Sequence, residues 1–118
     1  MRPSPWRDWL GLPKRKWQFV FTVEAGDEIP EAIPKRGVVL VGTMTRPKWV
    51  AFDCPCDLGH RIMLNTDSSR RPYWSIRSFA PVTLSPSIDD VTLTRRCHFL
   101  LQQGRIRWVR GLERSWHR

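Results

Sequence analysis

The residues best suited to chemistry in this sequence are its cysteines and histidines, which gather in two short stretches. The first stretch holds Cys54, Cys56 and His60, and the second holds Cys97 beside His98. Thiolates and imidazoles are the ligands that zinc prefers, and four such donors make a tetrahedral site. The chain has 3 cysteines, an odd number that excludes a complete disulfide framework. The sequence therefore predicts one zinc ion per chain, bound by residues from both stretches.

The spacing within each stretch limits which residues can share the ion. Pro55 restricts the backbone between the first two cysteines, and Gly59 lets the loop curl so that His60 returns to the same ion. Neighbouring residues in a strand point to opposite faces. We therefore expect either Cys97 or His98 to supply the fourth ligand, while the other is left for a different role.

Three other interpretations of these residues lead to different chemistry. Buried cysteines are common in ordinary protein cores. If the ion had only three protein ligands, water could bind and Asp53 or Asp57 could act as a base. A site with three thiolates would be a weak Lewis acid, so a structural ion is favoured. A deaminase is excluded because the chain lacks a His-x-Glu sequence before a Cys-x-x-Cys sequence.

Short stretches rich in β-branched and aromatic residues alternate with turn residues along the chain. No helical periodicity persists beyond about two turns, so we expect an all-β fold of short, mostly antiparallel strands with little helix, stapled by the zinc site. The segment 85–90 is expected to be a turn or the start of a brief helix. The expected strands are 17–23, 37–42, 48–52, 61–64, 73–79, 82–84, 97–101 and 105–109.

A chain of 118 residues corresponds to one domain with short extensions. We expect a basic N-terminal arm rich in Trp and Pro over 1–16, a zinc-stabilised β domain over 17–110, and a basic tail over 111–118. The formal net charge is +9, and much of it lies in the two ends. Basic ends with interleaved tryptophans could bind nucleic acid, could meet an acidic protein, or could simply keep the chain in solution.

No apolar run approaches the ~20 residues needed to span a membrane. The first twelve residues lack the continuous apolar stretch of a signal peptide. We therefore expect a cytoplasmic protein that has no membrane partner and keeps its thiols reduced.

Several motifs occur together in one order, and the chain resembles a known family through them. Over about 17–110 it is similar to a bacterial family of small Cys-Pro-Cys and Cys-His-Phe proteins. Members are encoded beside ubiquitin-like modifiers and their activating and conjugating enzymes, often in presumed antiphage defence clusters. The resemblance implies a bacterial protein whose partners are such a modifier and these enzymes. The motifs are GDEIPEAIP (26–34), PKWVAFDCPCDLGHRIMLN (47–65), Trp74, TLSPSI (83–88) and CHFLLQQGRIRW (97–108).

The chain departs from the family pattern at two positions, and nearby residues compensate. Members read CPCGCG in the first motif and C-x-S-H-F in the second. Here Leu58 and Arg95 replace two of the cysteines, whereas His60 and Cys97 each stand two residues later. The resemblance therefore implies a zinc site made by Cys54, Cys56, His60 and Cys97. It leaves His98 without a metal to bind.

A free histidine beside the metal site suggests a general base. Ser87 follows Pro86 in the TLSPSI motif and is the expected nucleophile, with Ser85 as its competitor. Serine needs an adjacent base to react at neutral pH, and Asp89 or Asp90 could orient that base. With the resemblance, these residues predict a small zinc-stabilised serine peptidase that processes or deconjugates a bacterial ubiquitin-like modifier.

The competing hypothesis is a non-catalytic, zinc-ribbon-like adaptor for a modifier, its conjugation enzymes or nucleic acid. Ser87 would then only cap a turn, His98 would pack near Trp108, and arginines such as Arg105 and Arg107 would matter more. The distance between the Ser87 hydroxyl and the His98 ring separates the two hypotheses.

Overall fold

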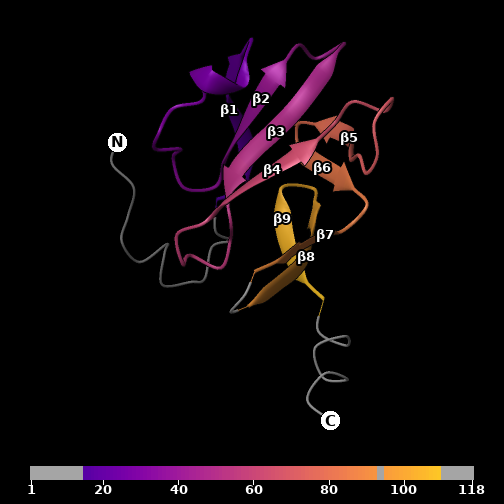
Figure 1. The fold of residues 1–118 in the computed structure, drawn as a ribbon. Coiled ribbons are helices and arrows are strands. Elements are labelled where there is room, and N and C mark those ends of the chain that lie inside the picture. Colours follow the sequence, from indigo (N-terminus) through magenta and orange to yellow (C-terminus); the bar gives the residue numbers. More distant parts are fainter. Residues whose placement is uncertain (1–14, 93–94, 110–118) are drawn as a thin grey trace, which may run out of the picture.

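The computed structural model describes residues 15–92 and 95–109, and these form three small sheets (Figure 1). The strand orders are β1-β2-β3-β4, β5-β6 and β7-β8-β9, and every neighbouring pair except β1 and β2 is antiparallel. The predicted all-β fold of short, mostly antiparallel strands is therefore confirmed. The elements are β1 (Gln18–Val23), η1 (Gly26–Glu28), β2 (Gly37–Gly42), β3 (Pro47–Asp53), β4 (Arg61–Asn65), β5 (Ser75–Phe79), β6 (Val82–Ser85), β7 (Ile88–Val91), β8 (Arg96–Gln102) and β9 (Arg105–Trp108).

The first sheet is built around β2, whose sequence GVVLVG is buried over its whole length. A continuous apolar run suits a strand that is covered on both faces. The turn into β3 requires glycine at position 42, where φ is 110° and a Cβ would come within 2.6 Å of the Arg46 carbonyl oxygen. This tight turn sets the register of β3, which leads into the cysteine loop.

The main core lies between the first sheet and the two smaller ones. Phe52 of β3 and Phe99 of β8 are both fully buried, and their rings meet edge to face with centroids 6.3 Å apart. Val82 and Leu84 of β6 join the same cluster. This contact holds β8 against the end of β3, and it thereby brings the two cysteine-bearing stretches together.

The third sheet begins with a strand that the sequence analysis missed. The expected turn or helix start over 85–90 is wrong, because Ile88–Val91 forms β7 and pairs with β8. Two aspartates are unfavourable in a strand. Tertiary contacts override that preference: Ile88 is buried opposite Phe99, and both aspartates are bound by basic side chains from other elements.

The remaining boundaries are close to those expected. The β8–β9 hairpin turns at Gln103 and Gly104, which both have positive φ. Tyr73 and Trp74 precede β5 instead of belonging to it, and a short 3₁₀-helix, η1, lies between the first two strands. Most of the expected arm and the whole expected tail lie outside the described residues. No helix in the described part of the chain is long and apolar enough to cross a membrane.

Candidate functional site

The cysteine loop and β8 bring four metal-type donors together. Cys54 and Cys56 follow β3, His60 precedes β4, and Cys97 lies in β8; their ligand atoms all lie within 4.8 Å of one another. The His60 Nε2 atom is 3.2 Å from the Cys56 Sγ and 3.8 Å from the Cys97 Sγ. Tetrahedral bonds of about 2.3 Å would place ligand atoms about 3.8 Å apart. The cluster therefore fits a metal ion such as zinc, with the residues that the sequence predicted.

The loop that carries three of these donors is closed by its own backbone. The Cys54 N–H donates to the His60 carbonyl at 2.9 Å, and the Asp57 N–H donates to the Cys54 carbonyl at 3.1 Å. Gly59 has a φ of 89°, which is the curl expected from the sequence, and Asp57 adopts a similar left-handed conformation at 62°. These hydrogen bonds and turns hold the three donors of the loop near one point.

His60 is oriented by a carboxylate on the neighbouring sheet. Its Nδ1 lies 3.1 Å from the Asp90 Oδ2, so Nε2 faces the sulfurs. A carboxylate behind a ligating histidine fixes the ring and its tautomer. Asp90 pairs with Cys97 in the β7–β8 register and lies on the same face. From its place in the sequence, Asp90 was expected only as a possible partner of His98, so its contact with His60 is a new finding.

Burial, together with interactions with neighbouring cysteines, raises the pKa of the Cys54 and Cys97 thiols above the usual value for cysteine. A bound cation has the opposite effect, because it stabilises the thiolate. Metal binding at this cluster must therefore release protons, as it does at other thiolate sites.

The other face of β8 carries the predicted serine–histidine pair. The Ser87 Oγ lies 2.9 Å from the His98 Nε2, within hydrogen-bond reach. Ser87 directly precedes β7, and His98 is only 9% exposed in β8. His98 and Cys97 are consecutive strand residues, so the imidazole points away from the metal-type cluster. The structure therefore joins the two residues that the sequence hypothesis paired.

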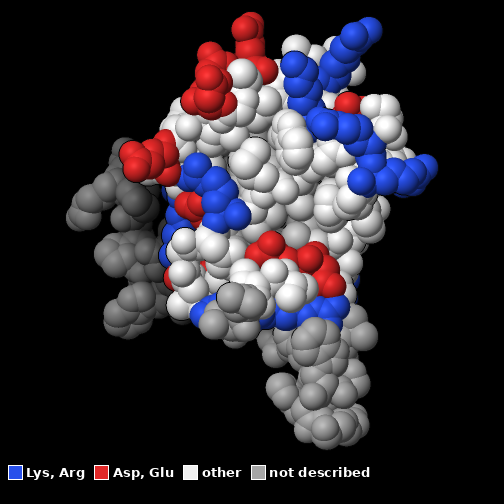
Figure 2. Space-filling model, in the orientation of Figure 1, with Lys and Arg blue, Asp and Glu red and all other residues white. Residues whose placement is uncertain are grey.

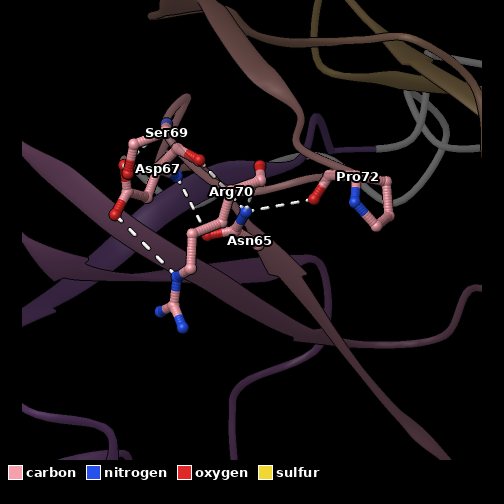
Figure 3. A network of polar contacts seen from close by, with 5 residues as sticks. All are labelled: Asn65, Asp67, Ser69, Arg70 and Pro72. Carbon is pink, nitrogen blue, oxygen red and sulfur yellow. Dashed lines mark hydrogen bonds and ion pairs between the residues drawn. The ribbon is translucent and has the colours of Figure 1, made fainter.

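The turn after β4 positions the backbone of Ser87. The Asn65 side-chain amide donates to three carbonyls of the turn, those of Asp67, Arg70 and Pro72, at 3.0–3.1 Å (Figure 3). The Asn65 carbonyl in turn accepts the Trp74 N–H at 2.8 Å. The indole Nε1 of Trp74 donates to the Ser87 carbonyl at 3.2 Å. Trp74 belongs to the family-like motifs, but nothing in its sequence context indicated this contact.

Neither predicted orienting carboxylate bonds to His98. Asp89 is its register partner, but the Asp89 carboxylate accepts hydrogen bonds from the Arg96 guanidinium, which holds the pKa of Asp89 below its usual value. Asp90 binds His60 on the other face. Among the described residues no partner bonds the buried His98 Nδ1, and no hydrogen bond joins Ser85 to His98. The pair is therefore a dyad within the described part of the chain.

Charged side chains lie on the protein surface over the strands next to the dyad (Figure 2). Figure 2 shows acidic side chains over the region of β7 and β8, with basic side chains beside them. Asp89 and Arg96 form such a pair, and their side chains are 36% and 16% exposed. The ion pair places a fixed negative charge on the His98 face of the sheet, partly balanced by its arginine.

Fold and site together define a small all-β protein with a Cys₃His cluster on one face of a strand and a Ser–His pair on the other. A comparison with protein-family models matches residues 25–109 to BubE, described as a bacterial ubiquitination-like system serine protease. The chain therefore belongs to the BubE family, and the family resemblance drawn from its motifs is confirmed. This membership ties the protein to the components of such a system. Searches of curated proteins and of solved structures found no match.

Proposed function

We propose that this protein is a zinc-stabilised serine peptidase that processes or deconjugates a bacterial ubiquitin-like modifier. Ser87 is the nucleophile and His98 is its general base. The observation that carries this proposal is the 2.9 Å contact between the Ser87 Oγ and the His98 Nε2. The BubE match supports the reaction class, because the family is described as a serine protease.

The mechanism follows from the orientation of the pair. The Ser87 Oγ attacks the carbonyl carbon of the scissile peptide bond while the His98 Nε2 accepts its proton. His98 then returns that proton to the leaving amine, which leaves an acyl ester on Ser87. Water, deprotonated by His98, hydrolyses the ester and regenerates both residues. The Trp74 indole holds the Ser87 carbonyl and so limits movement of the nucleophile.

Asp89 assists the base through its charge. Interaction between Asp89 and a positively charged His98 contributes to the low pKa of that carboxyl, after the larger effect of Arg96. The ionised carboxylate lies on the same face of the sheet as His98 and places a negative charge near the ring that takes the proton. This electrostatic help needs no hydrogen bond to the His98 Nδ1.

Zinc bound by Cys54, Cys56, His60 and Cys97 would have a structural role. Three thiolates and one imidazole would complete the four ligands that zinc prefers, so the ion would crosslink the segments that carry them and leave no position for water. Cys97 and His98 are adjacent, so this crosslink fixes the backbone that carries the base. The zinc-stabilised domain proposed here spans 17–110.

Cleavage of the natural modifier tests the proposal. The zinc-loaded protein is incubated with the modifier encoded beside its gene, fused at its C-terminus to a reporter, and the products are weighed by intact-mass spectrometry. We expect cleavage by the wild type, none by Ser87→Ala, and nearly normal cleavage by the control Ser85→Ala. Equal cleavage by Ser87→Ala would refute the assigned nucleophile. No cleavage by the wild type would favour the adaptor hypothesis.

A further inference from the structure

A groove of about 570 Å³ lies beside the cysteine loop, and the proposed mechanism does not use it. Its volume falls within the range of about 300–1,000 Å³ that is typical of ligand sites. Ile106 and Trp108 of β9 line it, and Trp108 is the register partner of Phe99, which faces the core. Consecutive strand residues alternate between faces. The groove therefore lies on the opposite face of the β7–β9 sheet from His98.

The groove combines an apolar floor with basic side chains. Trp17, Ile33, Ile106 and Trp108 supply apolar surface, and Trp108 remains 37% exposed. An exposed aromatic side chain in a concave site is typical of binding surfaces.

The charges that line the groove favour a negatively charged ligand. Its two acidic residues already have partners, since Asp57 pairs with Lys35 at 3.9 Å and Asp53 pairs with Arg61 at 3.3 Å. Three lining arginines have no carboxylate partner within the described part of the chain. These are Arg15, Arg36 and Arg105.

The backbone of β9 offers hydrogen-bonding groups along the same groove. The Val109 N–H donates to the His98 carbonyl at 2.9 Å, so these two residues form a bonded pair. Bonded and non-bonded pairs alternate in an antiparallel ladder. The N–H and C=O groups of Ile106 and Trp108 therefore point away from β8, towards the open edge of the sheet. Among the described residues no backbone group pairs with them.

We propose that this groove binds an extended acidic peptide segment, which adds to the sheet as a strand beside β9. Main-chain hydrogen bonds to Ile106 and Trp108 supply affinity, alternate apolar side chains contact the floor, and acidic side chains meet the arginines. The assignment of this segment to the peptidase substrate rests on the proposed function, whereas binding itself does not. Because the groove and the dyad lie on opposite faces, the segment acts as a tether that raises the local substrate concentration.

Fluorescence anisotropy with the full-length Ser87→Ala protein, loaded with zinc, tests the groove without cleavage. The probe is a fluorescein-labelled, end-capped decapeptide of alternating Glu and Val. Arg15→Glu combined with Arg36→Glu should weaken binding at least about tenfold. The control combines Arg77→Glu with Arg107→Glu, which changes the net charge equally at exposed positions outside the groove lining. It should bind like its parent, and thermal melting confirms that both variants fold.

Two further probes test the kind of ligand and the binding mode. Two peptides are compared: one is methylated at the backbone nitrogens of its Glu residues, the other at those of its Val residues. Only one of the two should bind more weakly than the unmethylated peptide. Equal binding by both methylated peptides, or equal loss in both arginine variants, would overturn the proposal. Preferential binding of a ten-nucleotide single-stranded DNA would overturn it in favour of nucleic acid. Since the Ser87→Ala protein cannot cleave by the proposed mechanism, failure to bind refutes the groove alone and leaves the peptidase proposal to its own assay.

Discussion

The two faces of β8 differ in how their functional groups are assembled. On one face, Cys97 meets three donors from a single closed loop, and all four ligand atoms fall within 4.8 Å. On the other face, the His98 ring bonds Ser87, which directly precedes β7, and among the described residues its second nitrogen has no partner. One face thus gathers four donors that could hold a metal ion, and the other carries the proposed Ser87–His98 dyad.

The strand β8 can carry both a candidate metal ligand and the proposed base because they lie on opposite faces. Strand alternation places consecutive residues on opposite faces, so the sulfur of Cys97 and the imidazole of His98 cannot compete for one ion. β7 repeats the arrangement, since Asp89 lies on the His98 face and Asp90 supports His60 on the metal face. Each face can therefore be altered while the other serves as an internal control.

The largest expected effect on cleavage comes from substitutions in the Ser87–His98 dyad. Ser87→Ala and His98→Ala should each lower the cleavage rate at least about ten-thousand-fold, and the double variant should be no worse, because the two residues act as a unit. Both variants should keep the metal content of the wild type. Initial rates and elemental analysis measure these effects. Loss of metal from His98→Ala would place the ring at the ion and contradict the division between the faces.

Substitutions of the metal-type cysteines should affect both faces of β8. Cys54→Ser and Cys97→Ser should lose the metal and several kcal/mol of stability, because a structural ion contributes directly to folding. Cleavage should fall with the folded fraction. Thermal melting and elemental analysis test this, with Met63→Ser at an exposed position of β4 as the control. A variant that remains folded and active without metal would refute the structural role of the ion.

A milder change tests the carboxylate that orients the His60 ring but does not itself belong to the Cys₃His cluster. Asp90→Asn should weaken metal binding about 10–100-fold, because it removes the carboxylate that holds the His60 ring. Cleavage at saturating zinc should remain close to normal. Competition with a chelator measures the affinity. The control Asp57→Asn alters an exposed carboxylate of the same loop and should have little effect, whereas equal losses in both variants would argue against an orienting role for Asp90.

The smallest effect concerns the turn that supports Trp74. The Ser69 hydroxyl and N–H donate to the Asp67 carboxylate and lower its pKa. Ser69→Ala should move that pKa back towards its ordinary value, as measured by NMR titration, with cleavage unchanged. Because the pKa of Asp67 is lower in the folded protein, this contact stabilises the fold at pH values above the unfolded-state pKa. That stabilisation is lost as the pH falls through the folded-state pKa of Asp67. An unchanged Asp67 pKa would contradict the assignment.

The sequence predicted the elements that depend on neighbouring residues in the chain, and it missed those that depend on residues far away in the chain. GVVLVG gave the bounds of β2 because its apolar run depends little on context, and the Cys-Pro-Cys spacing with Gly59 indicated a metal loop. β7 was missed because Asp89 and Asp90 disfavour a strand until Arg96 and His60 bind them. Those partners come from other elements, and only the folded chain brings them together.

The same reasoning applies to the candidate site. Ser87 and His98 were paired by chemistry and a motif, but their 2.9 Å contact depends on the β7–β8 register that the sequence did not predict. The contact from Trp74 to Ser87 and the groove along β9 combine segments far apart in the chain. No local pattern marks such contacts, since they depend on how the three sheets pack.

Covalent labelling of the nucleophile tests the central claim most directly. A fluorophosphonate probe reacts with a serine only when a neighbouring base activates it. After labelling of the zinc-loaded wild type and digestion, peptide mass mapping should place the adduct on Ser87, and the His98→Ala variant should show none. An adduct on another serine, or an unlabelled protein that still cleaves the modifier, would contradict the account.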